Sequence, residues 1–348
     1  MEIMKNWKKT YSYNDISIVS RVISELKHRN EADTSIEFCG VKLDIPIVAA
    51  PMPDICNGEL ALSLAKMGVL GIIHRFQSID TQYNEYQSCF DFISPDKHID
   101  FRNIVGCAIG ITGDYQERFN KLYIGGCRIF CLDTANGANF QIKNVMHWIC
   151  NEYISSADSE YEKLYIIGGN VATKEGFVFL SDLGIDAIRV GIGTSGICET
   201  RTETGIYQHQ VSALLECIEI KDRYRLETKI IADGGIKIPA DMCKALAVGA
   251  DVVMCGNIFA GTTESPGNVL KIDGKLKKLY RGAASYSVQQ ENGRNDIEYN
   301  EGGESLVEYK GSVEKVVKRF KAGLQSSMSY LGARTLQEYQ QNASIVLL

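Results

Sequence analysis

The chain has 348 residues, 45% of them hydrophobic, and a formal net charge of −6. An acidic chain without a basic cluster argues against nucleic acid as a partner, and no run approaches the ~20 apolar residues that a membrane helix needs. The N-terminus is polar and basic, which is not typical of a signal peptide. The 11 cysteines form no Cys-x-x-Cys pair, which argues against disulfides and structural zinc. We therefore expect a cytoplasmic protein.

Three stretches of the chain repeat one order: an apolar helix, a glycine turn and an apolar strand. They are residues 61–74, 180–193 and 245–256. Glycine directly after a helix is a common C-cap. Regular alternation of helix and strand is typical of a parallel sheet.

Eight short segments are expected to form that sheet, because each is apolar throughout, as strands buried on both faces are. Eight such units close into a barrel. The alternative, an open doubly wound sheet, usually has one glycine fingerprint after its first strand, whereas here glycine-rich or acidic ends follow many strands. The expected strands are residues 45–52, 69–74, 104–110, 127–133, 165–171, 187–193, 229–233 and 252–256.

These observations predict an α/β protein, a (β/α)8 TIM barrel that forms one catalytic domain over residues 1–348. One helix is expected between His74 and the strand that begins at Ile104. That connection is too short for an inserted domain, so we expect none.

A glycine-rich loop from Gly191 to Arg201 follows the predicted sixth strand and ends with a cysteine, Cys198. The glycines let the backbone approach a ligand closely, and Arg201 together with free backbone N–H groups would favour a thiolate. Most other cysteines lie in apolar patterns, where free cysteine is a small buried hydrophobe. On local context alone, Cys198 is either a catalytic nucleophile or an ordinary core residue.

Polar and glycine residues also follow the other predicted strands. A carboxylate such as Asp233 suits a ribose diol, and the N–H groups of Gly234 and Gly235 suit a phosphate, which barrels often bind after strands seven and eight. Each position has an ordinary alternative: Met52 as core, or Asp133 as an Asx turn.

In chain order, these segments resemble the IMP dehydrogenase/GMP reductase family. Its cysteine loop reads Gly-x-Gly-x-Gly-Ser-x-Cys-x-Thr-Arg, and here Ser195 and Gly196 stand in swapped order. The later segments Tyr280-Arg281-Gly282 and Glu301-Gly302 also match, and Pro53 is inserted before Asp54.

The resemblance implies that Cys198 attacks carbon 2 of a purine nucleotide, GMP or IMP, while Thr200 and Glu301 move protons. It implies binding of a nicotinamide cofactor, a monovalent cation such as K+ held by backbone carbonyls, and a homotetramer. The implied substrate residues are Met52, Ser195, Gly196, Asp233, Gly234, Gly235, Gly256, Asn257, Tyr280, Gly282, Ala283 and Gly302; the cofactor residues are Arg75, Asp133, Asn170 and Ser285; the cation residues are Gly191, Gly193 and Cys198.

Within this family we expect a GMP reductase that uses NADPH. The connection after His74 is short, Asn136 is the reductase-like residue, and residues 327–333 resemble a reductase ending. The flap from Ala284 to Glu301 is short and holds Arg294-Asn295 instead of the Arg-Tyr pair by which dehydrogenases activate water. Two alternatives stay open: an IMP dehydrogenase without its regulatory module, and a non-catalytic nucleotide-binding paralogue.

Overall fold

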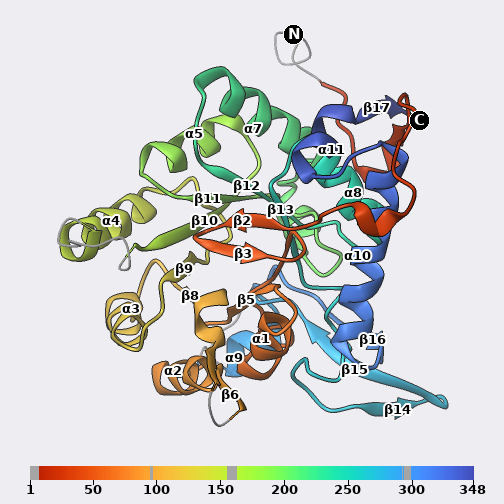
Figure 1. The fold of residues 1–348 in the computed structure, drawn as a ribbon. Coiled ribbons are helices and arrows are strands. Elements are labelled where there is room, and N and C mark those ends of the chain that lie inside the picture. The colour runs from red at the N-terminus through yellow and green to blue at the C-terminus, as the bar shows by residue number, and fades with distance from the viewer. Residues whose placement is uncertain (1–7, 95–96, 155–162, 292, 294–298) are drawn as a thin grey trace.

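The computed structural model describes residues 8–94, 97–154, 163–291, 293 and 299–348. Its centre is a closed barrel of eight parallel strands, in which β13 pairs with β4 to complete the ring (Figure 1). This confirms the predicted barrel, and the strands at residues 165–171 and 229–233 have the predicted bounds. The strands are β4 (Ile47–Ala49), β5 (Leu70–Ile73), β8 (Val105–Ile109), β9 (Ile129–Leu132), β10 (Tyr165–Val171), β11 (Ala187–Val190), β12 (Lys229–Asp233) and β13 (Val252–Cys255).

Helices surround the barrel and bury one face each against the outside of the strands (Figure 1). Their starts carry side-chain caps: Asn57 accepts from the N–H of Leu60, and Thr173 accepts from the N–H of Gly176. The helices are α1 (Gly58–Ala65), α2 (Ile79–Gln87), α3 (Tyr115–Ile124), α4 (Phe140–Ile149), α5 (Lys174–Asp182), α7 (Gln210–Tyr224), α8 (Pro239–Val248), α10 (Val313–Tyr330) and α11 (Leu336–Asn342).

A hairpin closes the amino end of the barrel. It consists of β2 (Ile36–Phe38) and β3 (Val41–Leu43), and it lies across the barrel in Figure 1. Its turn residues Cys39 and Gly40 have φ of 48° and 72°, which suits the tight turns of two-residue hairpins. Phe38 and Leu43 are buried with the inward-facing strand residues in a second core, inside the barrel.

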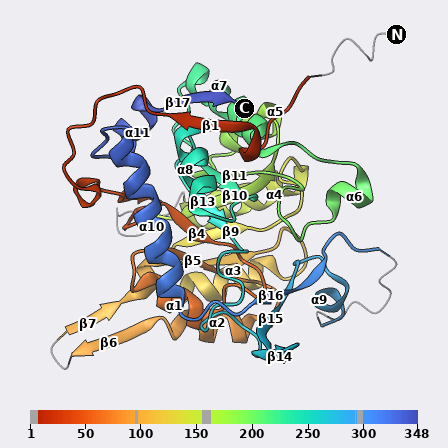
Figure 2. The same ribbon diagram turned by 90° about the vertical axis from the view of Figure 1, so that its right-hand side faces the viewer.

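The carboxyl end of the barrel carries the longer additions. They are α6 (Thr200–Thr204), α9 (Tyr286–Glu291) and an antiparallel sheet of β14 (Leu270–Ile272), β15 (Lys275–Arg281) and β16 (Glu304–Glu308). Figure 2 shows α6 and α9 together at one end of the molecule. The first and last strands also meet, because β1 (Ile16–Val19) pairs antiparallel with β17 (Ser344–Leu347).

The connection between β5 and β8 differs from the expectation of a single helix. It contains α2 and, in addition, an antiparallel hairpin of β6 (Phe90–Ser94) and β7 (Lys97–Asp100). This hairpin lies at the end of the molecule opposite α6 and α9 (Figure 2). The sequence prediction missed it because a short antiparallel pair has no long apolar run.

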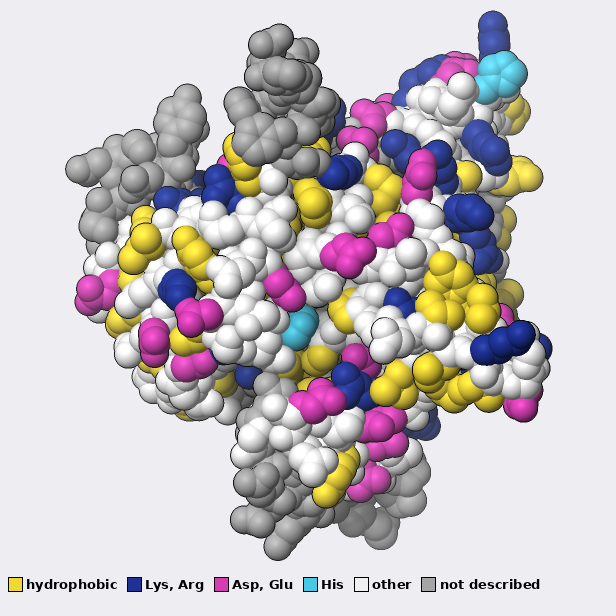
Figure 3. Space-filling model, turned by 90° about the horizontal axis from the view of Figure 1, so that it is seen from below, with side chains coloured by type: hydrophobic (Ala, Val, Ile, Leu, Met, Phe, Trp, Pro, Cys, Tyr) yellow, Lys and Arg dark blue, Asp and Glu magenta, His cyan; other side chains and the backbone are white. Residues whose placement is uncertain are grey.

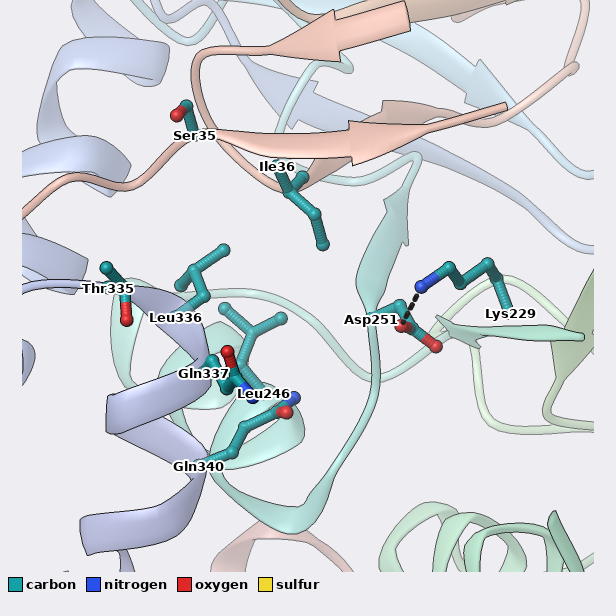
Figure 4. A pocket seen from close by; sticks show the side chains of 9 residues that line it. All are labelled: Ser35, Ile36, Lys229, Leu246, Asp251, Thr335, Leu336, Gln337 and Gln340. Carbon is teal, nitrogen blue, oxygen red and sulfur yellow. Dashed lines mark ion pairs between the residues drawn. The ribbon is translucent and has the colours of Figure 1, made fainter. Parts of the chain in front are cut away.

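A cavity of about 340 Å³ lies at the amino end, between α11, β2 and the starts of β12 and β13. An ion pair between Lys229 Nζ and Asp251 Oδ1, 3.3 Å apart, lies at its edge (Figure 4). In barrel enzymes the chemistry occurs at the carboxyl ends of the strands. This cavity is therefore not the candidate active site.

The surface is mixed in charge. On the face drawn in Figure 3, lysine and arginine side chains are interspersed with aspartate and glutamate. Within the described residues, none of the helices has the length and apolar character to cross a membrane.

Candidate active site

Three functional side chains line up at the end of the cysteine loop. The thiol of Cys198 donates to Thr200 Oγ1 at 3.1 Å, and that hydroxyl donates to Glu301 Oε2 at 2.7 Å. A thiol, a hydroxyl and a carboxylate in this order provide a path for the thiol proton, which a nucleophilic cysteine must lose. The structure thus brings together the three residues predicted to be catalytic.

A short backbone joint holds Glu301 beside the loop. The N–H of Glu199 donates to the carbonyl of Glu301 at 2.8 Å, and the N–H of Gly303 donates to that of Ile197 at 2.9 Å. Gly302 forms isolated bridges to Cys198 and to Ser285, so both ends of the flap meet at the thiol. A Cβ on Gly302 would lie 2.5 Å from the Ser285 nitrogen, so this position requires glycine.

Charged side chains form a layer across the mouth of the barrel. Arg189 Nη1 donates to Asp133 Oδ1 at 3.0 Å, and its Nε donates to Asp233 Oδ2 at 2.9 Å. Asn170 Nδ2 also donates to Asp233, and Arg75 Nε donates to Asp133. The two acidic side chains are only 14% and 15% exposed. Pairing therefore offsets the cost of burying these charges.

Charge and burial at the mouth of the barrel shift the pKa values of Asp133 and His74. Burial alone would raise the pKa of Asp133, but Arg75 and Arg189 outweigh it and hold that pKa below its ordinary value. Burial, helped by the charge of Arg118, lowers the pKa of His74 to about 4. His74 is therefore neutral at pH 7, and its Nδ1 accepts from the N–H of Phe76. This contact gives His74 a structural role.

Met52, Gly256 and Tyr280 meet beside the mouth. The Tyr280 hydroxyl lies 3.9 Å from Met52 Sδ, and Tyr280 is only 4% exposed. A Cβ on Gly256 would lie 3.0 Å from that hydroxyl and 3.3 Å from the sulfur. Glycine at this position therefore keeps a narrow space open between the three residues.

Gly234 and Gly235 form a glycine cradle where β12 ends. Their φ values are +110° and +76°, which favour glycine. A Cβ on Gly234 would collide with Thr194 Oγ1 from the cysteine loop. In the part of the chain that the structure describes, the N–H groups of both glycines have no acceptor. Such free N–H groups at a turn can bind an anion.

Two contacts differ from what local sequence suggested. The guanidinium of Arg201 stacks on the Tyr207 ring, 4.4 Å from its centroid, so it has a partner other than the thiol. Asp54, which was given no role because the inserted Pro53 departs from the family pattern, is buried and accepts from the backbone N–H, Nε and Nη2 of Arg281 at 2.8–2.9 Å.

Arg189 was not predicted as a site residue. The available signal was a charged residue inside an otherwise apolar strand, Ala-Ile-Arg-Val. The Asp54–Arg281 pair gave no such signal, because 227 residues separate its partners.

The residues predicted to bind the cofactor differ in how accessible they are to a ligand. Arg75 and Asp133 face each other across 3.2 Å, and Asn170 Nδ2 donates to the carbonyl of Gly191. The Arg75 side chain is 32% exposed, so its guanidinium edge fits a cofactor phosphate. Ser285 is completely buried, so a direct contact with a cofactor requires residues 284–285 to move.

The predicted cation residues fit in part. The Gly191 carbonyl already accepts a hydrogen bond from Asn170 Nδ2. Among the described residues, no donor to the carbonyls of Gly193 and Cys198 is found, so these two oxygens could bind a cation. Arg294 and Asn295, on which the flap argument drew, lie outside the described residues.

A (β/α)8 barrel with a thiol, a hydroxyl and a carboxylate in line at the carboxyl ends of its strands has the active-face arrangement of the barrel enzymes. A family model described as "IMP dehydrogenase / GMP reductase domain" matches residues 10–348. The chain belongs to this family. Its members are oxidoreductases that bind purine nucleotides and use a nicotinamide cofactor.

Relatives with both family names match most of the chain. Inosine-5'-monophosphate dehydrogenase of Borreliella burgdorferi is 30% identical over 97% of this chain and 94% of its own length. GMP reductase 1 of Mus musculus is 31% identical, over 93% of this chain and 91% of its own length. GMP reductase of Lactobacillus delbrueckii subsp. bulgaricus is 32% identical, over 94% and 92%. Because a dehydrogenase also matches almost end to end, the short connection after His74 does not separate the two activities.

Proposed function

We propose that the chain is a GMP reductase, which converts GMP, NADPH and a proton to IMP, ammonia and NADP+. The observation that carries this proposal is the path from Cys198 through Thr200 to Glu301, with contacts of 3.1 and 2.7 Å. Along this path the thiol proton leaves the sulfur, and the same proton can then return to a departing amine.

The chemistry balances in two steps. In the first, the Cys198 sulfur bonds to purine carbon 2, the bond from carbon 2 to the amino nitrogen breaks, and Glu301 and Thr200 supply the proton that completes ammonia. In the second, carbon 2 gains a hydride, the carbon–sulfur bond breaks and IMP leaves. NADPH supplies that hydride when it is bound.

The remaining residues hold the substrates in this proposal. Asp233 accepts from the ribose hydroxyls, the free N–H groups of Gly234 and Gly235 bind the phosphate, and Met52 packs on the base. Arg75, next to Asp133, provides a cation for the nicotinamide cofactor. The monovalent cation and the homotetramer remain predictions of the family resemblance.

The choice of a reductase over a dehydrogenase rests on the flap between Ala284 and Glu301. Its ends are joined at Gly302, and fewer than twenty residues lie between Ser285 and Gly302. A dehydrogenase needs a group that activates water to hydrolyse the covalent adduct, and the sequence of this flap contains no Arg-Tyr pair. The second candidate, IMP dehydrogenase, is favoured by Pro51-Met52, by residues 71–74, and by the full-length match to a relative of that name.

One pair of assays on the purified chain decides between them. We expect NADPH oxidation that requires GMP and releases ammonia, and little XMP from IMP with NAD. Strong XMP formation without GMP-dependent NADPH oxidation would assign the chain as a dehydrogenase. Tight GMP binding with neither reaction would instead identify the non-catalytic paralogue.

A further inference from the structure

The cysteine loop has a glycine, without a hydroxyl, at position 196, where the family order has serine. Ser195 precedes Gly196 here, in the reverse of the family order. A Cβ placed on Gly196 would meet one heavy atom of the described chain within 4.0 Å outside its own neighbours, and that atom is Lys237 Cε. The space in front of Gly196 is thus bordered by a lysine side chain.

The backbone of Lys237 is held in place next to the cradle. Lys237 lies between β12 and α8, two residues after Gly235, and Asp241 Oδ2 accepts from its N–H at 2.9 Å. Asp241 also accepts from the N–H of Ile238 at 3.0 Å, as a cap of α8. The lysine therefore extends from a fixed point toward Gly196.

The ammonium group of Lys237 is available to a ligand. The residue is exposed, and no ion pair or hydrogen bond of its ammonium group is found within the described chain. Lys310, another lysine at this end of the barrel, differs because its Nζ donates to the carbonyls of Asn257 at 2.5 Å and of Ile258 at 3.3 Å. Of these two lysines, Lys237 is the one whose ammonium group has no partner among the described residues.

From this geometry we infer that Lys237 binds the 5'-phosphate of the purine nucleotide, in place of the hydroxyl that the family's Gly-Ser order would put at position 196. The inference rests on the proposed function, since it places a nucleotide in the site. A phosphate monoester carries about −1.5 to −2 charges at pH 7. The glycine cradle offers N–H groups without a full charge, and Lys237 adds the counter-charge. The protein should therefore discriminate strongly between nucleotide and nucleoside.

The test compares GMP with guanosine by titration calorimetry on the full chain. Lys237→Met keeps the apolar stem and removes the charge. We expect it to weaken GMP binding by about tenfold or more, as loss of a charged hydrogen bond does, and to leave guanosine binding unchanged. Lys237→Arg should retain most of the GMP affinity. Lys174→Met, an exposed lysine in the first turn of α5 at the same end of the barrel, is the matched control and should not change either affinity.

A second variant tests the replacement itself. Gly196→Ser in the Lys237→Met background should recover part of the lost GMP affinity, because a side chain fits at residue 196. If the unaltered chain binds GMP and Lys237→Met binds it equally well, the role of Lys237 is wrong and the proposed function stands. If Lys237→Met weakens GMP and guanosine equally, its effect is not on the phosphate, which also overturns the inference. If the unaltered chain binds neither GMP nor IMP, both proposals fall.

Discussion

The two ends of the barrel are made by the same eight strands, but their inward-facing side chains differ in polarity. Toward the amino end, the inward-facing residues are apolar and the β2–β3 hairpin covers them with Phe38 and Leu43. At the carboxyl end, the next inward positions are Asp133, Arg189 and Asp233, and Arg189 forms an ion pair with each of the two aspartates. Side chains of a strand alternate between its two faces, so every second residue points into the barrel. The same inward-facing series therefore supplies apolar residues to the core and charged residues at the carboxyl end.

This difference separates stability from chemistry. The apolar end gains free energy by excluding water, whereas ion pairs at the charged end offset the cost of burying its charges. Substitutions at the amino end should therefore change the free energy of unfolding, and those at the carboxyl end should change turnover or binding.

The largest effect is expected for Cys198→Ala at the carboxyl end. Loss of the nucleophile should reduce GMP-dependent NADPH oxidation by orders of magnitude and leave the thermal unfolding temperature nearly unchanged. Cys150→Ala, a half-buried cysteine outside the loop, is the control and should keep its turnover. Near-normal turnover of Cys198→Ala would rule out the covalent mechanism.

At the amino end, Phe38→Ala should show the reverse pattern. Phe38 is 1% exposed, so its truncation should lower the free energy of unfolding by about 3–5 kcal/mol, measured by urea denaturation, with turnover retained under native conditions. Ile23→Ala, at a residue 97% exposed, should change stability by less than about 0.5 kcal/mol. A large loss of turnover in folded Phe38→Ala would show that the two ends are coupled.

His74 lies at the carboxyl end, directly after β5, and its titration gives stability a pH dependence. Its pKa is about 4 when folded and 6.5 as a free side chain, so between these values the unfolded chain binds more protons. The contribution of neutral His74 to the free energy of unfolding is fully present above about pH 6.5. As the pH decreases toward 4, the free energy of unfolding falls by up to about 3 kcal/mol. In His74→Asn, denaturation curves at pH 7 and pH 5 should differ less than in the unaltered chain. An equal pH dependence in both would exclude His74 as its source.

The smallest effect is expected for Asp233→Ala. It removes one acceptor from the charged layer and, in the proposed function, the contact to ribose, so GMP affinity should fall by about tenfold or more. Asp222→Ala, an equal change of charge on the surface of α7, is the control for calorimetry. Unchanged affinity in Asp233→Ala would place the ribose elsewhere.

Local patterns predict the barrel well and the contacts at its mouth less well. The eight strands were predictable because each is a short, largely apolar run, and this signal is contained within a few residues. The β6–β7 hairpin and the β14–β16 sheet were missed because their pairing depends on partners rather than on a local apolar run.

The site shows the same limit. The triad of Cys198, Thr200 and Glu301 was predicted from the family resemblance, which carries long-range information that periodicity lacks. The partner of Arg201 was misjudged, because the nearest cation in sequence turned instead to Tyr207. Asp54 could not be paired with Arg281 from its neighbours, since the inserted Pro53 concealed the correspondence.

The joint at Gly302 has a consequence for how the flap can vary. Because Gly302 bridges both Ser285 and Cys198, the chain between residues 286 and 301 is a closed loop with fixed ends. The entropy of closing such a loop grows only with the logarithm of its length, about 0.6 kcal/mol for each doubling. Residues can therefore be inserted there at little thermodynamic cost and without displacing Glu301, so a change of reaction could arise by lengthening this loop around an unaltered thiol.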